Sequence, residues 1–161
     1  MKLAATFLLS IFLFVCQELP NVRQSYVDAS KSQKNAEEFY NLMVNYNKDN
    51  KVLLAYKGAS IALKAKYAKQ IKQKKSLFIE GVKMLETALK SDPNNLEIRL
   101  IRLSIQENSP KILNYKSNID EDKKLLLSNF DKQNQSLKEY IKNYIVQSNG
   151  FNDKEKKSIL N

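Results

Sequence analysis

Histidine and tryptophan are absent from the 161-residue sequence, and cysteine occurs once, at position 16. Without histidine, the chain lacks the usual general base at neutral pH and the commonest transition-metal ligand. A single cysteine cannot form a disulfide within the chain, so helix packing has to supply the stability of the fold. Histidine-dependent catalysis and histidine-bound metals are therefore excluded.

Glycine and proline are also scarce, with three of each. A β-rich fold of this length would need many tight turns, and glycine, proline and Asn-Gly pairs are the residues that form them. Lysine, leucine, alanine, glutamate and glutamine are plentiful, and these residues lose little conformational freedom in a helix. The sequence therefore predicts an all-α fold with one hydrophobic core.

The first sixteen residues have the pattern of an export signal. A short positive start precedes Leu3–Val15, which is apolar apart from Thr6 and Ser10. This stretch is too short to cross a hydrocarbon core of about 30 Å, but it matches the hydrophobic region of a secretory signal peptide. We expect residues 1–16 to be a signal peptide and residues 17–161 to form a single helical domain, periplasmic or secreted.

Three fates of the segment around Cys16 remain open. Leu13–Cys16 resembles a lipobox, in which Cys16 would be lipidated and would anchor the chain as a lipoprotein, although Val15 stands where that motif has Gly, Ala or Ser. Ordinary cleavage after Cys16 would instead leave Gln17 as the first mature residue. An uncleaved N-terminal anchor is the third alternative.

Apolar residues recur at helical spacing through the rest of the chain. The stretch Leu96–Ile105 is apolar on two faces, which is typical of a helix buried between neighbours, so we expect it at the centre of the core. Gly150 is expected in the left-handed conformation that ends many helices. The expected helices cover residues 17–33, a segment from Asn35, Asn50–Gln73, Ser76–Lys90, Leu96–Ile105, Ser109–Tyr115, Asp120–Phe130, Asn134–Ser148, and a last one from Asn152 or Asp153 to Leu160.

The segment Glu80–Asn95 resembles the second helix of a tetratricopeptide repeat. Such a helix has a small residue, a large apolar residue four positions later, an alanine three further on and a proline five beyond that. Gly81, Leu85, Ala88 and Pro93 keep this spacing. Small residues let paired helices approach closely, and proline sets the turn into the next repeat.

This resemblance implies antiparallel helix pairs in a tetratricopeptide-like, right-handed helical array of about six to eight helices. Its core lies around residues 50–106. Gly58 would take the glycine position of the first helix, with roughly ten additional residues between it and the second helix. The chain as a whole is similar to small exported proteins of the Bacteroidota, but this similarity does not indicate any particular activity.

Lysine dominates the charge, since the formal net charge is +10. Lysines crowd together between positions 64 and 75, which predicts either a solvated helix face or a surface for a partner or an anionic ligand. The charge also fits a lysine-rich proteome without any selection for binding. The candidate partner-binding residues are Lys64, Lys66, Tyr67, Lys69 and Lys72.

No catalytic, cofactor-binding or metal-binding residue is expected. Ser60 and Lys64 lie four residues apart on one helix, but no glycine-rich oxyanion loop accompanies them. Asp120, Glu121 and Asp122 lack the spacing of a calcium loop, and acidic residues at the start of a helix explain them better.

The preferred hypothesis is therefore a non-catalytic, exported helical-repeat module that binds a protein or peptide partner in the cell envelope. The alternative is a basic surface that binds acidic polysaccharide, lipid head groups or extracellular nucleic acid. Intracellular nucleic acid is not an expected partner of an exported chain.

Overall fold

The structure, a computed structural model, describes residues 19–47 and 49–160. These residues form helices and connecting turns, with no strand among them, as the composition predicts. After a helix over residues 19–29, called here the 19–29 helix, the order is α2 (Gln33–Val44), α3 (Lys51–Tyr67), α4 (Ile71–Ser91), α5 (Leu96–Asn108), η1 (Lys111–Leu113), α6 (Ile119–Asn129), η2 (Phe130–Lys132), α7 (Gln135–Gln147) and α8 (Asp153–Lys157).

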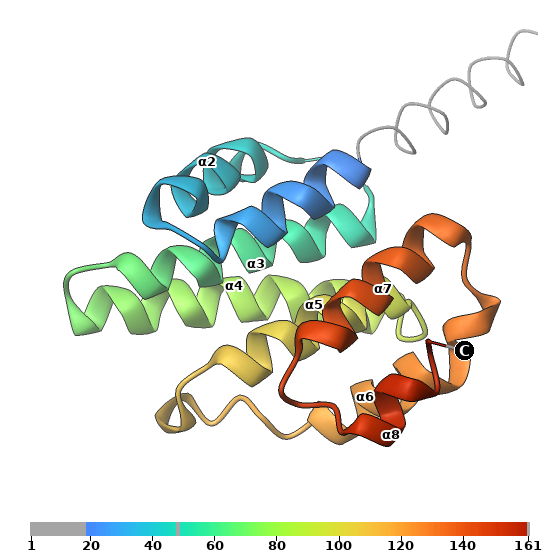
Figure 1. The fold of residues 1–161 in the computed structure, drawn as a ribbon. Helices are drawn as coiled ribbons and strands as arrows, with labels where there is room; N and C mark the ends of the chain where they lie inside the picture. The colour runs from blue at the N-terminus through green and yellow to red at the C-terminus, as the bar shows by residue number, and fades with distance from the viewer. Residues whose placement is uncertain (1–18, 48, 161) are drawn as a thin grey trace, which may run out of the picture.

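The helices pack in layers on either side of a central antiparallel pair. In Figure 1, α3 and α4 run side by side across the middle of the molecule, with the 19–29 helix and α2 on one side and α5 to α8 on the other. The 19–29 helix also reaches the far layer, because Arg23 donates to Ser136 at the start of α7 over 2.8 Å. The two sides are thus joined into one body.

Helix α5 lies at the centre of the core, as its two apolar faces predict. One face, with Ile98, Ile101 and Ile105, belongs to a hydrophobic cluster shared with α2, α3 and α4. The opposite face belongs to a second cluster, shared with α6, α7 and the C-terminal segment. That face consists of Leu96, Leu100 and Leu103. The helix therefore separates the two clusters and is buried by both.

Asparagine or serine is the N-cap residue of most of the α-helices from α2 to α8. The Asn50 side chain accepts a hydrogen bond from the Leu53 amide at the start of α3, and Asn95 accepts from the Glu97 and Ile98 amides at the start of α5. Ser32, Asn134 and Asn152 cap α2, α7 and α8 in the same way. Each cap satisfies backbone donors that the first turn of a helix leaves free.

The boundary between α3 and α4 differs from the predicted one. The sequence indicates one helix to Gln73 and another from Ser76, whereas α3 ends at Tyr67 and α4 begins at Ile71. Ala68 and Gln70 take extended backbone angles between them. The turn contains neither glycine nor proline, so no local signal marks it, and the lysine run has no apolar period to reveal it.

Two further local predictions are wrong. The segment from Ser109 to Tyr115 contains only the short η1, because Asn114 takes a left-handed conformation, φ 50°, and stops it. Gly150 does not have a positive φ. A Cβ atom at position 150 would overlap the Glu107 carboxylate, so a larger residue would require that side chain to move.

Helices α3 and α4 cross in backbone contact at two glycines. A Cβ atom built on Gly58 would lie 2.5 Å from the Gly81 carbonyl oxygen, and one built on Gly81 would lie 2.6 Å from the Ala62 amide nitrogen. Both distances are shorter than any allowed contact, so only glycine fits at either position. Gly58 and Gly81 thus set the spacing of the central pair.

Candidate functional site

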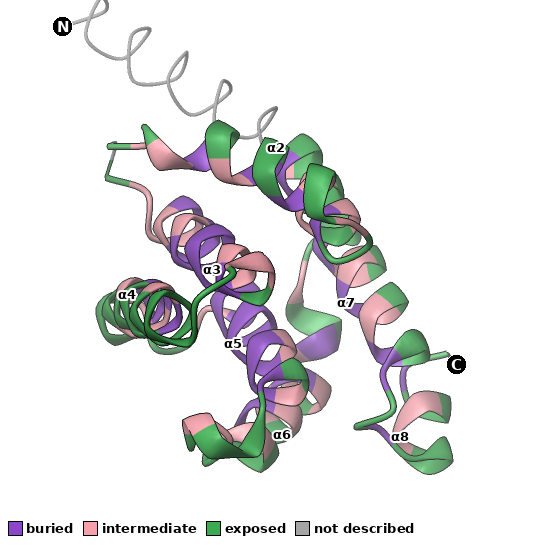
Figure 2. Cartoon of the chain, turned by 90° about the vertical axis from the view of Figure 1, so that its left-hand side faces the viewer, coloured by how far each residue is buried: buried purple, intermediate pink, exposed green. Residues whose placement is uncertain are grey.

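The lysines of the predicted cluster gather at the free end of the α3–α4 hairpin. We call this region the basic end, defined as Lys66, Lys69, Ile71, Lys72, Lys74 and Lys75. All six residues are exposed, as is the whole stretch 69–76. Figure 2 shows this side of the molecule, where the first turns of helix α4 are exposed. The basic end therefore projects from the body of the protein into solvent.

Charge at the basic end is of one sign. No acidic residue occurs between Lys64 and Ile79. Within the described chain, Lys69, Lys72 and Lys75 have no hydrogen bond or ion pair. Lys66 lies over the Tyr67 ring, 5.3 Å from its centroid. Neighbouring positive charges repel one another unless counter-ions or a ligand neutralise them.

The lysines do not stabilise the helix that carries most of them. Cations are favourable near the carboxyl end of a helix, and Lys64 and Lys66 lie in the last turn of α3. Lys72, however, lies in the first turn of α4, where the positive end of the helix dipole disfavours it, and Lys74 and Lys75 follow in the next turn. No acidic residue in the first turn offsets them. Lys74 donates to the Lys66 carbonyl oxygen in the last turn of α3 over 3.5 Å, so helix stability leaves Lys72 and Lys75 unexplained but not Lys74.

Lys64 lies apart from the basic end. Its ammonium group pairs with Glu37 at 3.1 Å and lies 3.7 Å above the centre of the Tyr40 ring, and both partners are on α2. It therefore fastens α3 to α2. Ser60 is buried and donates to the Lys57 carbonyl oxygen over 2.8 Å, so Ser60 and Lys64 each have other partners and do not form a nucleophile–base pair.

The four residues of the repeat-like pattern lie on α4 and at its exit. Gly81, Leu85 and Ala88 are buried, and Gly81 contacts α3 directly. Pro93 lies in the turn between α4 and α5, where its carbonyl oxygen accepts a hydrogen bond from Arg99 over 2.7 Å. Cys16 and the whole export signal lie outside the described residues.

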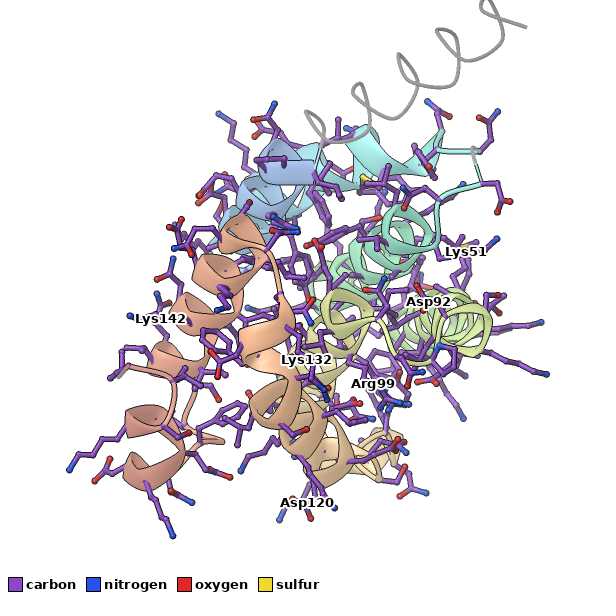
Figure 3. All side chains as sticks on the ribbon, turned by 90° about the vertical axis from the view of Figure 1, so that its right-hand side faces the viewer. Lys51, Asp92, Arg99, Asp120, Lys132 and Lys142 are labelled. Carbon is purple, nitrogen blue, oxygen red and sulfur yellow. The ribbon has the colours of Figure 1, made fainter. Side chains whose placement is uncertain are left out.

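A buried ionic cluster that the sequence patterns do not predict lies beneath the α4–α5 turn. Asp122 is completely buried, and its oxygens accept hydrogen bonds of 2.7 Å from Arg99 and Arg102. Figure 3 shows Arg99 between the turn that holds Asp92 and the helix that holds Asp120. Burial, the largest single influence, lowers the pKa of Arg102, but the hydrogen bond to Asp122 and the negative charges of Asp122 and Glu86 together outweigh it, so the pKa is raised. Glu121 and Glu86, at the edge of the cluster, also pair with these arginines, so carboxylates balance both buried positive charges.

A second buried ion pair joins the 19–29 helix to α5. Arg23 donates to both oxygens of Glu97, at 2.8 and 2.7 Å, and the Tyr56 hydroxyl donates to the same carboxylate over 2.8 Å. Burial, together with the negative charge nearby, raises the pKa of Tyr56 well above its usual value. Burial also raises the pKa of Tyr26, beside it, to about 12. Tyr26 and Tyr56 are thus neutral packing residues at any physiological pH.

A signal for these ion pairs is present in the sequence. Arginine occurs only at positions 23, 99 and 102, and all three are buried. Arginine forms bidentate pairs with carboxylates and loses less hydration on burial than lysine does. In a chain whose other cationic residues are all lysine, the three arginines therefore indicate buried ion pairs with carboxylates.

The described residues offer no group of acidic residues that could hold a metal ion. None of their helices is long and apolar enough to cross a membrane. A comparison with protein-family models, with curated proteins and with solved structures finds no match.

Proposed function

We propose that this chain is a non-catalytic, exported interaction module of the cell envelope, and that the basic end is the surface it presents to a protein partner. The observation that carries the proposal is the position of Lys72 in the unfavourable first turn of α4, with Lys69 and Lys75 exposed near it and no acidic residue in that turn. A positive charge in the first turn of a helix disfavours that helix, so its presence needs another explanation. Binding to a partner with acidic groups is one.

We further propose that the central pair is tetratricopeptide-like. Three features support this: the glycine crossing of α3 and α4, the burial of Leu85 and Ala88 on α4, and Pro93 at the exit into α5. The residues added between Gly58 and Gly81 lengthen both helices beyond the packed body. On this interpretation the extension is what carries the basic end, and the repeat-like part is its support.

Neutralising three lysines of the basic end is expected to weaken partner binding about tenfold, because charge complementarity governs association at such surfaces. The variant is Lys69→Gln, Lys72→Gln and Lys75→Gln. Its matched control is Lys124→Gln, Lys154→Gln and Lys157→Gln, three exposed lysines on α6 and α8 that remove the same charge. The measurement is recovery of cross-linked envelope proteins by each purified chain.

Both variants should keep the far-ultraviolet circular dichroism of the natural chain, because all six lysines are exposed. The thermal midpoint of the control should be unchanged, and that of the first variant should be unchanged or slightly raised, because Lys72→Gln removes a charge that opposes the dipole of α4. Equal losses in the two variants would mean that net charge alone drives capture, and the basic end would then have no special role.

The alternative function, binding of acidic polysaccharide, lipid head groups or extracellular nucleic acid, is favoured by a separate observation. The exposed cations are lysines, whereas every arginine is internally paired. Lysine acts as a flexible point charge without directional demands, which suits a diffuse polyanion. Heparin retention above that of an unrelated protein of equal charge, falling steeply with salt, would favour this alternative.

Export has its own test. If residues 1–16 are a signal peptide, the chain isolated from its native envelope should have the mass of a protein that begins at Gln17 and should be found in the soluble fraction. A mass increased by acyl chains on Cys16, in the membrane fraction, would instead mean a lipoprotein. A mass that includes Met1 would contradict both.

A further inference from the structure

An exposed isoleucine lies among the lysines of the basic end. Ile71, the first residue of α4, is 84 % exposed, whereas Phe78 and Leu85 on the same helix are 8 % and 0 % exposed. Residues seven apart lie on one side of a helix, so all three belong to the stripe of α4 that faces the core. The apolar side of α4 therefore extends beyond its packed part, and Ile71 is exposed at the hairpin end.

A single exposed isoleucine on a protein surface is common and needs no explanation. Here, however, five exposed lysines lie within five positions of it in the sequence, on the hairpin end and the neighbouring turn, and no acidic residue lies among them. An apolar apex within a group of long cationic side chains matches the requirements of a bilayer interface. The apolar group enters the acyl boundary while the ammonium groups stay with the lipid phosphates.

The shape of the basic end fits a flat surface better than a peptide. The hairpin end projects from the body (Figure 1). Two shallow hollows of the described surface lie elsewhere, along the 19–29 helix and α2. The cations are flexible lysines, which neutralise mobile head groups without fixed geometry, while the arginines, which would recognise carboxylates by paired hydrogen bonds, are all used internally. Shape and side-chain chemistry thus point to the same occupant.

We propose that the basic end docks the protein onto a bilayer rich in anionic phospholipid, with Ile71 entering the interface and Lys66, Lys69, Lys72, Lys74 and Lys75 lying among the head groups. This inference rests on the proposal that the basic end is the interaction surface, and it develops the alternative function given above by naming anionic lipid head groups as the ligand.

Vesicle binding tests the electrostatic half. The natural chain should sediment with vesicles of equal parts phosphatidylglycerol and phosphatidylcholine, and should not sediment with phosphatidylcholine alone. Each basic residue near an anionic membrane contributes about 1 kcal/mol, so Lys69→Gln, Lys72→Gln and Lys75→Gln together should weaken binding at least about tenfold. The control set on Lys124, Lys154 and Lys157 should weaken it much less. Absence of binding to the anionic vesicles, or equal loss in both sets, would overturn the proposal.

Insertion of the apex has a separate readout, because the chain has no tryptophan. Ile71→Trp therefore introduces the only one, at an exposed position where the fold should tolerate it. Its emission should shift to shorter wavelength on anionic vesicles and be quenched by brominated acyl chains. Leu160→Trp, at another exposed apolar position near the C-terminus, should show neither change.

The outcomes separate the two proposals. Lysine-dependent binding without quenching at position 71, matched by equal binding to heparin, would mean adsorption to any polyanion and would overturn the bilayer proposal. Failure on vesicles with retained lysine-dependent capture of an envelope protein would overturn it too, while the proposed protein-binding function stands. If the lysine substitutions affect neither vesicles nor protein capture, both proposals fail.

Discussion

Replacing Asp122 with asparagine is expected to lower the free energy of unfolding by about 3–5 kcal/mol, the usual cost of removing one partner from a buried ion pair. The substitution preserves size and shape but removes the charge that two buried guanidinium groups share. Arg99 and Arg102 are 6 % and 5 % exposed, so neither can regain full hydration without moving. The measurement is urea unfolding followed by circular dichroism, with the midpoint and slope compared with those of the natural chain.

The first turn of α6 supplies the matched control. Asp120 lies two residues earlier on the same helix and is exposed, so Asp120→Asn should change the unfolding free energy by only a few tenths of a kcal/mol. Adding Arg99→Met and Arg102→Met to Asp122→Asn should restore part of the lost stability, since apolar groups of similar volume replace buried ions at little cost. Equal, small effects at Asp120 and Asp122 would mean that the cluster is hydrated and not buried.

Replacing Gly58 with alanine is expected to destabilise the protein by about 1–3 kcal/mol through overpacking. Helix propensity alone predicts the opposite, a gain of about 1 kcal/mol when glycine in a helix interior becomes alanine. Packing should prevail, because the new methyl group would overlap the Gly81 carbonyl oxygen and the Leu85 amide, which belong to the rigid backbone of α4. The two helices would have to separate along the entire pair.

Thermal unfolding of three variants checks this expectation. Gly81→Ala should be destabilising like Gly58→Ala, because its methyl group would meet the Gly58 carbonyl oxygen. Thr87→Ala, at an exposed position on α4, should be neutral or slightly stabilising. A raised melting temperature for Gly58→Ala would show that α3 and α4 do not approach as closely as described, and the tetratricopeptide-like proposal would lose its main support.

The fold class and the centre of the core could be predicted because they depend on features that a sequence displays directly. The scarcity of glycine and proline excluded a turn-rich β fold, and the two apolar faces of α5 could be read from residue spacing alone. The α3–α4 turn could not be predicted in the same way. Ala68 and Gln70 have no strong turn preference, so the packing of the two helices determines where they separate.

The candidate site was predicted only in part. A run of lysines is visible in any sequence, but whether each lysine is exposed depends on its neighbours, and Lys64 proved to pair with Glu37 on α2. The acidic triplet at the start of α6 gave the same signal at all three positions. Only the approach of α5 makes Asp122 a buried partner of arginine while Asp120 stays in water. Long-range packing of that kind leaves no local pattern.

The buried ion pairs and the basic end have different tasks in this account. Arg23–Glu97 and the Asp122 cluster join α5 to the 19–29 helix and to α6. The α3–α4 hairpin extends from that body and presents its lysines away from it (Figure 1). If the basic end is the binding surface, as proposed, a well-ordered support would lower the entropy cost of placing it.

Photo-cross-linking in the native envelope tests the central claim, that the basic end is the interaction surface, most directly. A photoreactive amino acid would replace Lys72 in one strain and Lys124, exposed on α6, in another. We predict abundant adducts, to lipid or to protein, from position 72 and few from position 124. Equal yields from the two positions, or adducts from position 124 alone, would contradict the account.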